Sequence, residues 1–308
     1  MIGANGQVGS ELTKSLRAIH GQENVIGADL KVSMEGNNHL PFEILDASDA
    51  SKLAFLVERY RITQIYHLAA IMSEKGENNP VETWKVNMNC LFNVLEMAAE
   101  KKLRKVFIPS AITVFGSNIF RSNTPQDAIR TPETVLGMSK VASENWCSYY
   151  FKRYGVDVRS IRFPGIIGYQ AHPRSATTDY AIEIFQKAVQ GELFHCLLQE
   201  NTRLPMLYIA DAVDATLQVM EAPKSRITIR SSYNISGMSF TPSELAKEIR
   251  RYYPDFKIDY HPDFRQQIAD SWPESVDDSK AREDWDWKPK YDIAKMTVEM
   301  IQRYKGKS

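Results

Sequence analysis

Residues 3–9 read Gly-Ala-Asn-Gly-Gln-Val-Gly, and the interpretation of the whole chain starts from them. Gly3, Gly6 and Gly9 have the GxxGxxG spacing of a tight loop that opens a helix. Glycines let the backbone approach a pyrophosphate closely, and the first helical turn offers N–H groups and a positive dipole end. Because so short a pattern also arises by chance, it indicates a dinucleotide site only when its surroundings agree.

The segments after this loop alternate between helix and strand patterns. Leu12, Leu16 and Ile19 fall on one face of a helix over residues 10–19. Repeated strand–helix–strand units with short connections predict an α/β fold, with a doubly wound parallel sheet covered by helices on both faces. Further helices are predicted at residues 51–60, 80–101 and 137–154, and strands at residues 24–29, 64–70, 105–109 and 157–163.

This alternation weakens after residue 164, where loops and helices rich in Thr, Pro and Arg begin. We therefore predict a dinucleotide-binding domain over residues 1–163, with a returning segment at about 205–238. Residues 164–204 and 239–308 are predicted to form a smaller, discontinuous α/β lobe that binds the substrate.

Composition excludes several classes of protein. The 308 residues include 38 Lys and Arg against 38 Asp and Glu, and this zero net charge argues against nucleic acid as a partner. The 43% share of hydrophobic residues is ordinary for a folded domain. No apolar run approaches the ~20 residues of a membrane span, so we expect no membrane partner either.

The cysteines and the first residues bear on cellular location. Cys90, Cys147 and Cys196 are odd in number and widely spaced, which predicts reduced thiols and no metal site. The first residues lack the basic and apolar segments of a signal peptide. We expect a cytoplasmic protein, or a mitochondrial one if a transit segment precedes the chain. Only Met1 and Ile2 precede the loop, so the first strand is expected to be short and the sheet weakened.

Two acidic residues support a dinucleotide site. Asp29 ends the strand predicted at residues 24–29, about 20 residues beyond Gly9, where a carboxylate binds ribose hydroxyls. A carboxylate there repels a 2′-phosphate, which favours NAD over NADP; the alternative is an ordinary turn residue. Asp46 stands where an acidic side chain could meet the adenine amino group, and its alternative is a helix N-cap.

Eight segments resemble the extended short-chain dehydrogenase/reductase superfamily and, within it, the short-chain type of L-threonine 3-dehydrogenase, which is similar to sugar-nucleotide epimerases. The most specific is 268–287 (IADSWPESVDDSKAREDWDW). The others are 3–9 (GANGQVG), 109–116 (PSAITVFG), 134–140 (TVLGMSK), 157–167 (DVRSIRFPGII), 177–181 (TTDYA), 204–208 (LPMLY) and 239–242 (SFTP). The resemblance implies a Rossmann-type fold, NAD as cofactor, and oxidation of L-threonine to 2-amino-3-oxobutyrate with hydride transfer to nicotinamide C4.

The resemblance also implies a catalytic Tyr-x-x-x-Lys helix and an upstream Ser or Thr. In this family the tyrosine is the general base, and the lysine lowers its pKa and binds the nicotinamide ribose. Lys140 is present here, but Leu136 stands at the tyrosine position and Ala111 at the Ser/Thr position. Neither side chain accepts a proton or donates a hydrogen bond, so activity is expected to be impaired. Either an inactivated variant or a natural non-catalytic relative explains both residues.

Further contacts follow from the same resemblance. Ser73, Thr178 and Trp272 are the predicted substrate contacts, against the alternatives of a cap for Ser73 and Thr178 and a core position for Trp272. The predicted cofactor contacts are Gly3, Asn5, Gly6, Gln7, Val8, Gly9, Asp29, Asp46, Leu68, Ala69, Ala70, Lys140, Phe163, Pro164 and Ile166.

Two other functions stay open at this point. One is a sugar-nucleotide epimerase or reductase of the same superfamily, and the other is a non-catalytic NAD-binding protein, which Leu136 and Ala111 support. Relatives pair through two long helices, which correspond to residues 80–101 and 137–154. A homodimer is therefore expected.

Overall fold

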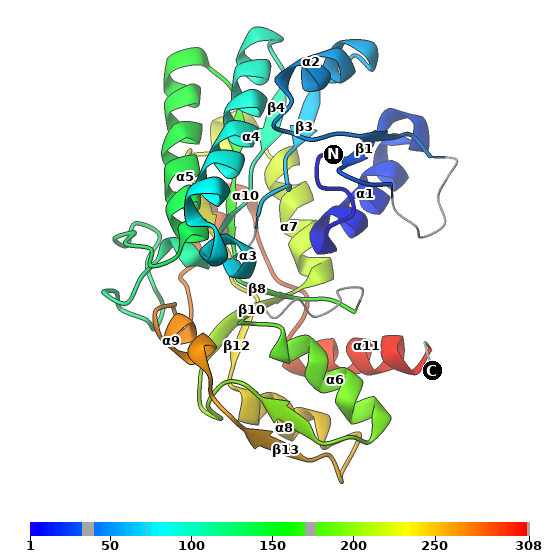
Figure 1. Ribbon diagram of the computed structural model, residues 1–308, viewed down its shortest axis with the longest axis vertical. Helices are drawn as coiled ribbons and strands as arrows, with labels where there is room; N and C mark the ends of the chain where they lie inside the picture. Colours follow the sequence, from blue (N-terminus) through cyan, green and yellow to red (C-terminus); the bar gives the residue numbers. More distant parts are fainter. Residues whose placement is uncertain (33–39, 72, 170–176, 307–308) are drawn as a thin grey trace. The chain divides into compact units, whose positions relative to one another are not determined.

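The computed structural model describes residues 1–32, 40–71, 73–169 and 177–306, with the backbone alone for residues 73–75 (Figure 1). These residues form two compact units, and each is described by itself. The first comprises Met1–Ala111, Thr134–Arg162 and Val213–Tyr233, and the second comprises Ile112–Glu133, Phe163–Ala212 and Asn234–Ser308.

Segments 112–133, 205–212 and 234–238, together with Phe163, were predicted to belong to the dinucleotide-binding domain but lie in the second unit. The assignment of cofactor and substrate binding to two parts of the chain stays a prediction.

The first unit contains a parallel sheet that a single residue completes. Ile2 donates its N–H to the Tyr66 carbonyl and accepts from the Leu68 N–H, both at 2.9 Å, and it also bridges Ala28. Ile2 thus stands between β1 (Gly27–Asp29) and β3 (Gln64–Tyr66). With β2 (Phe42–Ile44), β4 (Lys105–Phe107) and β6 (Val158–Arg159), the order is β2-β1-Ile2-β3-β4-β6, which is the 3-2-1-4-5-6 order of a Rossmann-type sheet.

Helices of the first unit begin and end close to their predicted positions. Thr134 caps α5 by accepting from the Gly137 N–H, and Gly155 ends the helix with a left-handed φ of 72°. α4 and α5 run side by side (Figure 1) and bury their facing sides in the core. The helices are α1 (Gln7–His20), α2 (Ala50–Arg59), α3 (Ser73–Asn78), α4 (Pro80–Glu100) and α5 (Val135–Tyr154), with a short 3₁₀ turn, η1 (Gln22–Asn24).

The strand predicted at residues 157–163 is divided at Ser160. β6 pairs with β4, whereas β7 (Ile161–Phe163) belongs to a separate sheet of order β11-β7-β5. The Ser160 carbonyl accepts from the Tyr233 N–H at 3.0 Å, so the chain exchanges one neighbouring strand for another there. β5 is Ser110–Ala111 and β11 is Tyr233–Asn234.

A buried ion pair joins α5 to this second sheet. Glu144 on α5 accepts from Arg162 Nε through Oε1 and from Arg162 Nη2 through Oε2, both at 2.8 Å. Ser110 Oγ donates to the same Oε1 at 2.6 Å. All three side chains are buried, so both carboxylate oxygens have partners inside the protein.

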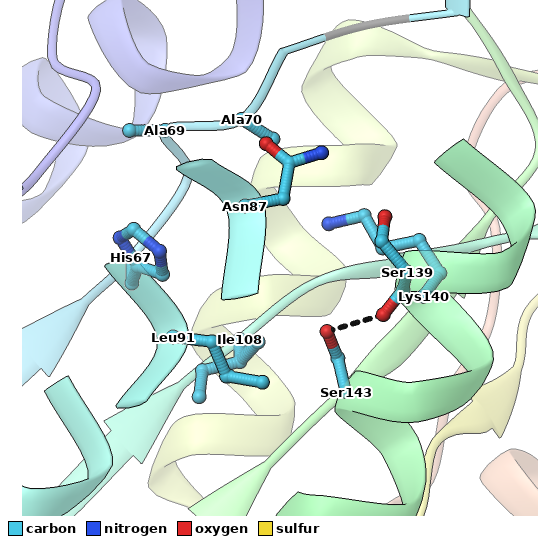
Figure 2. A pocket seen from close by; sticks show the side chains of 9 residues that line it. All are labelled: His67, Ala69, Ala70, Asn87, Leu91, Ile108, Ser139, Lys140 and Ser143. Atoms are coloured by element: carbon cyan, nitrogen blue, oxygen red, sulfur yellow. Dashed lines mark hydrogen bonds between the residues drawn. The ribbon is translucent and has the colours of Figure 1, made fainter. Parts of the chain in front are cut away.

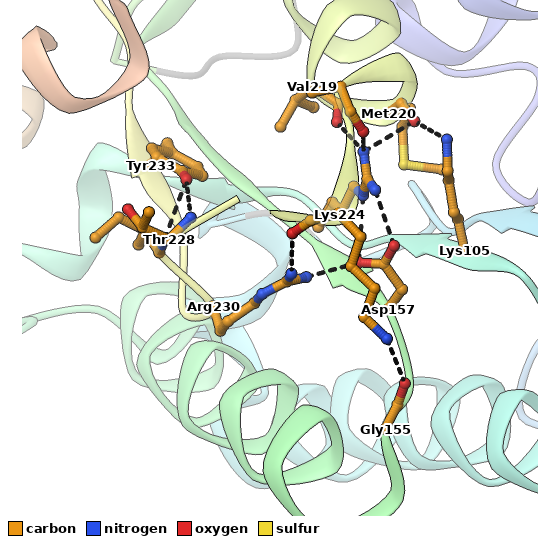
Figure 3. Close-up of polar contacts among 12 residues, drawn as sticks. Lys105, Gly155, Asp157, Val219, Met220, Lys224, Thr228, Arg230 and Tyr233 are labelled. Carbon is orange, nitrogen blue, oxygen red and sulfur yellow. Dashed lines mark hydrogen bonds and ion pairs between the residues drawn. The ribbon is translucent and has the colours of Figure 1, made fainter. Parts of the chain in front are cut away.

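A second buried cluster fixes the end of α7 (Ile209–Glu221) against β6 (Figure 3). Asp157 accepts from Arg159 at 2.8 Å and from Arg230 at 2.6 Å. Arg159 also donates to the carbonyls of Val219 and Met220 at 2.7 and 3.0 Å. The guanidinium group therefore satisfies carbonyls at the C-terminal end of the helix, where a cation is favoured.

The second unit contains a mixed sheet of order β12-β10-β8 and a two-stranded parallel sheet, β13-β9. Its strands are β8 (Gly165–Ile167), β9 (Phe194–Cys196), β10 (Leu204–Tyr208), β12 (Met238–Phe240) and β13 (Ile258–Tyr260). Its helices are α6 (Tyr180–Gln190), α8 (Pro242–Ile249), α9 (Phe264–Asp270), α10 (Ser279–Trp285), α11 (Ile293–Lys305) and the 3₁₀ turn η2 (Ile112–Val114). The 3₁₀ turn η3 (Lys224–Arg226) belongs to the first unit.

The structure also bears on the three cysteines and on membrane-spanning helices. Cys90, Cys147 and Cys196 are free and buried, and burial raises the pKa of each thiol. Among the described residues, no helix is long and apolar enough to cross a membrane.

The buried pair predicts the effect of Glu144→Gln. The substitution leaves the buried Arg162 charge without its carboxylate, which costs about 3–5 kcal/mol in such pairs. The urea midpoint of unfolding, followed by circular dichroism, is expected to fall markedly. The matched control is Glu58→Gln, which removes an exposed carboxylate from its pair with Lys101 and is expected to leave the midpoint nearly unchanged. Equal midpoints for Glu144→Gln and the wild type would contradict the role given to the buried pair.

Candidate functional site

The loop at residues 3–9 can be built only with glycine at two positions. Gly3 has a φ of 84°, and a Cβ atom there would lie 2.7 Å from the Ala69 nitrogen. A Cβ on Gly9 would lie 1.9 Å from the Gly3 carbonyl oxygen. Gly6 is the N-cap of α1 and supplies no side-chain cap, while Gln7 and Val8 form the first helical turn. The loop therefore presents backbone and the positive end of α1, as a phosphate requires.

Asp29 supports this loop directly. Its Oδ2 accepts from the Asn5 N–H at 2.9 Å, and its Oδ1 accepts from the Leu30 N–H at 2.8 Å. The carboxylate thus holds the turn in place, which agrees with the alternative that Asp29 is an ordinary turn residue. Its remaining lone pairs can still accept hydrogen bonds from a ligand. The ribose contact stays a prediction.

Asp46 is an exposed residue in a turn before α2. Its Oδ1 accepts from both the N–H and the hydroxyl of Ser48, and these bonds lower the pKa of the carboxyl group. The N-cap of α2 is Asp49, which accepts from the Lys52 N–H, so the helix-cap alternative for Asp46 is wrong. The adenine contact predicted for Asp46 stays a prediction.

A small pocket, partly open to solvent, lies beside the glycine loop (Figure 2). His67 follows β3 and Ile108 follows β4, so the pocket opens beyond the carboxyl ends of the parallel strands. The strand order reverses between Ile2 and β3, and ligands of open α/β sheets bind at that point. The lining residues are His67, Ala69, Ala70, Asn87, Leu91, Ile108, Ser139, Lys140 and Ser143.

Lys140 supplies the positive charge of this pocket. Its Nζ donates to the Pro109 carbonyl at 2.7 Å, and burial lowers the pKa of the ammonium group to about 8. His67 is neutral, because burial and, secondarily, the Lys140 charge lower its pKa to about 3. Its Nδ1 is buried and has no hydrogen-bond partner among the described residues.

These features fit a dinucleotide. The glycines allow a tight turn that presents backbone and the N-terminal end of α1, and the Lys140 cation can donate to ribose hydroxyls. The unpartnered His67 nitrogen is a buried polar atom left unsatisfied in the pocket.

Asn87 lies on α4 and holds the loop after β3. Its side-chain oxygen accepts from the Ile71 N–H at 2.8 Å, and its amide donates to the Ile71 carbonyl at 3.2 Å. Leu68, Ala69 and Ala70 precede this anchored residue, so the predicted cofactor-binding backbone is fixed from two sides.

Leu136 and Ala111 stand at the two positions where the resemblance predicts a tyrosine and a serine or threonine. Leu136 is buried in the first turn of α5, four residues before Lys140. Ala111 is half-buried on β5. The hydroxyl of the adjacent Ser110 is bonded to Glu144, which confirms that it points away from the Ala111 side. Neither Leu136 nor Ala111 carries a hydroxyl, and the catalytic roles that the resemblance implies for these two positions stay predictions.

Phe163, Pro164, Ile166 and Thr178 lie in the second unit. Phe163 and Pro164 are buried, and Ile166 is half-buried on β8. Thr178 packs against Gly165, where a Cβ atom would approach the threonine methyl carbon to 2.8 Å. A Cβ at this position would also lie 2.5 Å from the Met206 sulfur, so a larger residue at position 165 would displace Met206 or Thr178.

Trp272, also in the second unit, is buried just after α9. Its carbonyl accepts from Arg121 Nε at 2.9 Å. Ser73 begins α3, but its side chain lies outside the described residues. The roles of Thr178, Trp272 and Ser73 in substrate binding stay predictions.

The sequence did not predict six of the nine lining residues, which are His67, Asn87, Leu91, Ile108, Ser139 and Ser143. Ser139 donates to the Leu136 carbonyl and Ser143 to the Ser139 carbonyl, so both cap backbone groups of α5. The signal available for His67 was its position near the end of the strand predicted at residues 64–70.

Known proteins are similar to the chain over nearly all of its length. Residues 1–236 match the sequence profile of the NAD dependent epimerase/dehydratase family. A partial-consensus L-threonine 3-dehydrogenase is 49% identical, with a TM-score of 0.97 and coverage of 99% of this chain and 98% of the other. The holo form of the GalE-like L-threonine dehydrogenase from Cupriavidus necator is 48% identical (TM-score 0.95; 98% and 97% covered). The apo form of a monomeric L-threonine 3-dehydrogenase from a metagenome is 44% identical (TM-score 0.95; 99% and 98% covered).

The family profile spans most of the chain, and the structural similarity extends to both units. The glycine loop and the strand order are in the places that a Rossmann-type dinucleotide-binding fold requires. The chain therefore belongs to the NAD dependent epimerase/dehydratase family and has the scaffold of its short-chain L-threonine 3-dehydrogenases, with NAD as the cofactor.

Proposed function

We propose that this chain oxidises the β-hydroxyl group of L-threonine to give 2-amino-3-oxobutyrate and NADH, and that it does so slowly. The observation that carries the proposal is the Lys140 ammonium group in the pocket beside the glycine loop, four residues after a leucine. Similarity to L-threonine 3-dehydrogenases over 98–99% of the chain supports the choice of substrate.

NAD, when bound, would supply the hydride acceptor at nicotinamide C4, so this chain's own residues have to bind the alcohol and receive its proton. Lys140 is mainly protonated at neutral pH, because its pKa is about 8, and in the proposal it binds the nicotinamide ribose. Leu136 and Ala111 cannot receive or hold the proton. The loss of a positioned general base reduces a rate by about 10²–10⁴.

The remaining contacts are assigned as the sequence predicts. Asp29 binds the adenosine ribose and disfavours a 2′-phosphate, and the loop at residues 3–9 binds the pyrophosphate. Ser73, Thr178 and Trp272 contact the amino acid. A protein that binds NAD without turnover is the second candidate, and the observation that favours it is the absence of a hydroxyl at Leu136 and Ala111.

The double substitution Leu136→Tyr with Ala111→Ser tests the proposal. A phenol at 136 would lie one helical turn from the Lys140 ammonium group, which lowers its pKa toward neutrality, and the serine would hold the substrate hydroxyl. NADH formation from NAD⁺ and L-threonine, followed by absorbance, is expected to rise by about 10²–10⁴.

The matched control is Leu136→Phe with Ala111→Ser, which adds the ring without its hydroxyl and is expected to stay at the wild-type rate. If the Tyr variant binds NAD⁺ but gives no NADH with L-threonine, the substrate assignment is wrong. Wild-type turnover as fast as that of the Tyr variant would contradict the claim that the base is missing.

Cofactor binding is predicted to depend on Gly9. A methyl group at this position would meet the Gly3 carbonyl at 1.9 Å, so Gly9→Ala has to displace the loop. We expect NAD⁺ affinity, measured by calorimetry, to fall at least about tenfold, which is 1.4 kcal/mol. Gly306→Ala is the control, because its Cβ would meet nothing nearer than 3.6 Å. Unchanged NAD⁺ affinity in a folded Gly9→Ala protein would exclude the loop as the pyrophosphate site.

We also propose that two copies of the chain associate through α4 and α5. Trp84 on α4 and Trp146, Tyr149 and Tyr154 on α5 are exposed aromatic residues of the first unit. Trp146 and Tyr149 pack edge to face, with ring centroids 5.5 Å apart. Exposed aromatic clusters of this kind are typical of protein interfaces. One similar protein is described as monomeric, so the scaffold does not require a dimer.

The dimer is tested with Trp146→Glu combined with Tyr149→Glu. Charges placed in the proposed interface are expected to shift the sedimentation coefficient from that of a dimer to that of a monomer. Phe120→Glu changes an aromatic residue that is 86% exposed in the second unit, and should leave a dimer intact. A monomeric wild-type protein at micromolar concentration would rule the proposal out.

A further inference from the structure

The two-stranded sheet of the second unit carries three side chains that can bind a metal ion. His195 lies on β9, Asp259 on β13, and His261 follows β13. His195 Nδ1 lies 2.6 Å from Asp259 Oδ1, and His261 Nε2 lies 3.3 Å from Asp259 Oδ2. One ligand atom from each residue lies within 4.8 Å of the other two.

The strand register explains why these residues meet. His195 and Asp259 are direct partners in the parallel pairing of β9 with β13. His261 is two positions after Asp259, and residues two apart along a strand point to the same face. The His261 N–H donates to the Cys196 carbonyl at 2.7 Å, which extends the pairing beyond β13. The backbone therefore holds all three side chains on one side of the sheet.

This side of the sheet faces solvent. The neighbours of His195 on β9, Phe194 and Cys196, are buried, whereas the His195 side chain is 59% exposed. The side chains of His261 and Asp259 are 62% and 40% exposed. An ion can therefore reach the group from the surface.

The donor set matches a particular class of ion. Two imidazole nitrogens and one carboxylate oxygen suit Zn²⁺ and similar divalent transition metals, whereas Mg²⁺ prefers oxygen ligands and retains its waters. Bond lengths of about 2.0–2.2 Å around tetrahedral zinc place ligand atoms roughly 3.4 Å apart. The separations of 2.6 and 3.3 Å are shorter than this value, and no pair of ligand atoms exceeds 4.8 Å, so small rotations of the side chains would bring the three atoms to the required spacing.

We propose that His195, Asp259 and His261 form a surface site for Zn²⁺ or a similar transition-metal ion, with water completing the coordination. The site joins two strands whose facing residues are 64 positions apart in the sequence, so a bound ion cross-links β9 to β13 and stabilises the second unit. It uses none of the residues assigned to NAD or L-threonine, so its test is independent of the proposed function.

The experiment uses the full, untagged chain after treatment with a chelator. Zn²⁺ added alone is expected to bind with one ion per chain in isothermal titration calorimetry. At about 100 times the dissociation constant, it should raise the midpoint of thermal unfolding by roughly 5 °C. Mg²⁺ at the same concentration is expected to give no shift.

Three variants assign the binding to these residues. His195→Ala and Asp259→Asn are each expected to reduce Zn²⁺ affinity at least about tenfold and to remove the thermal shift. His20→Ala is the matched control, because His20 is an exposed histidine on α1 outside the group, and it should bind as the wild type does. All three positions tolerate substitution, since their side chains are at least 40% exposed or lie at a helix end.

Absence of Zn²⁺ binding to the wild type would overturn the proposal. So would binding that survives both His195→Ala and Asp259→Asn, or a thermal shift with Mg²⁺ as large as that with Zn²⁺.

Discussion

The buried ion pair between Glu144 and Arg162 is the interaction on which the candidate site of the first unit depends. Taking two charges out of water costs several kcal/mol for each ion, so such a pair survives only when its oxygens and nitrogens are well engaged. Here Arg162 reaches both carboxylate oxygens and Ser110 completes one of them. Because the three groups come from α5, β7 and β5, they permit one orientation of the helix against those strands.

That orientation determines where Lys140 lies. Lys140 is one helical turn before Glu144, and its ammonium group reaches the Pro109 carbonyl, next to Ser110. On the other side of the pocket, Gly3 approaches the backbone of Ala69 so closely that no larger residue fits. Backbone approach and one cation are enough to bind a dinucleotide, whereas proton transfer needs a single correctly placed hydroxyl. In the proposed function, the chain therefore binds the dinucleotide but lacks an efficient proton acceptor, because positions 136 and 111 carry Leu and Ala.

The second unit illustrates a different use of strand pairing. His195 and Asp259 meet because two strands pair in parallel, and His261 joins them through the period of two along β13. A site of this kind has no local sequence signature, since no spacing within either segment resembles a metal motif. It follows from the register between segments that are 64 residues apart.

The sequence by itself determined features that depend on residues close together along the chain. Apolar spacing located α4 and α5 to within two residues at either end, and the glycine spacing located the loop that opens α1. The family resemblance implied the positions of Leu136, Ala111 and Lys140, and their roles stay predictions. Those features depend on neighbours a few residues apart, so they can be read along the chain. Tertiary structure alone decided that Ser160 divides a strand, that His67 is buried beside Lys140 with a neutral ring, and that His195, Asp259 and His261 share one face. Each of these depends on which distant segments pack together and on how much water they exclude. Neither can be read from the spacing of residues within a short segment.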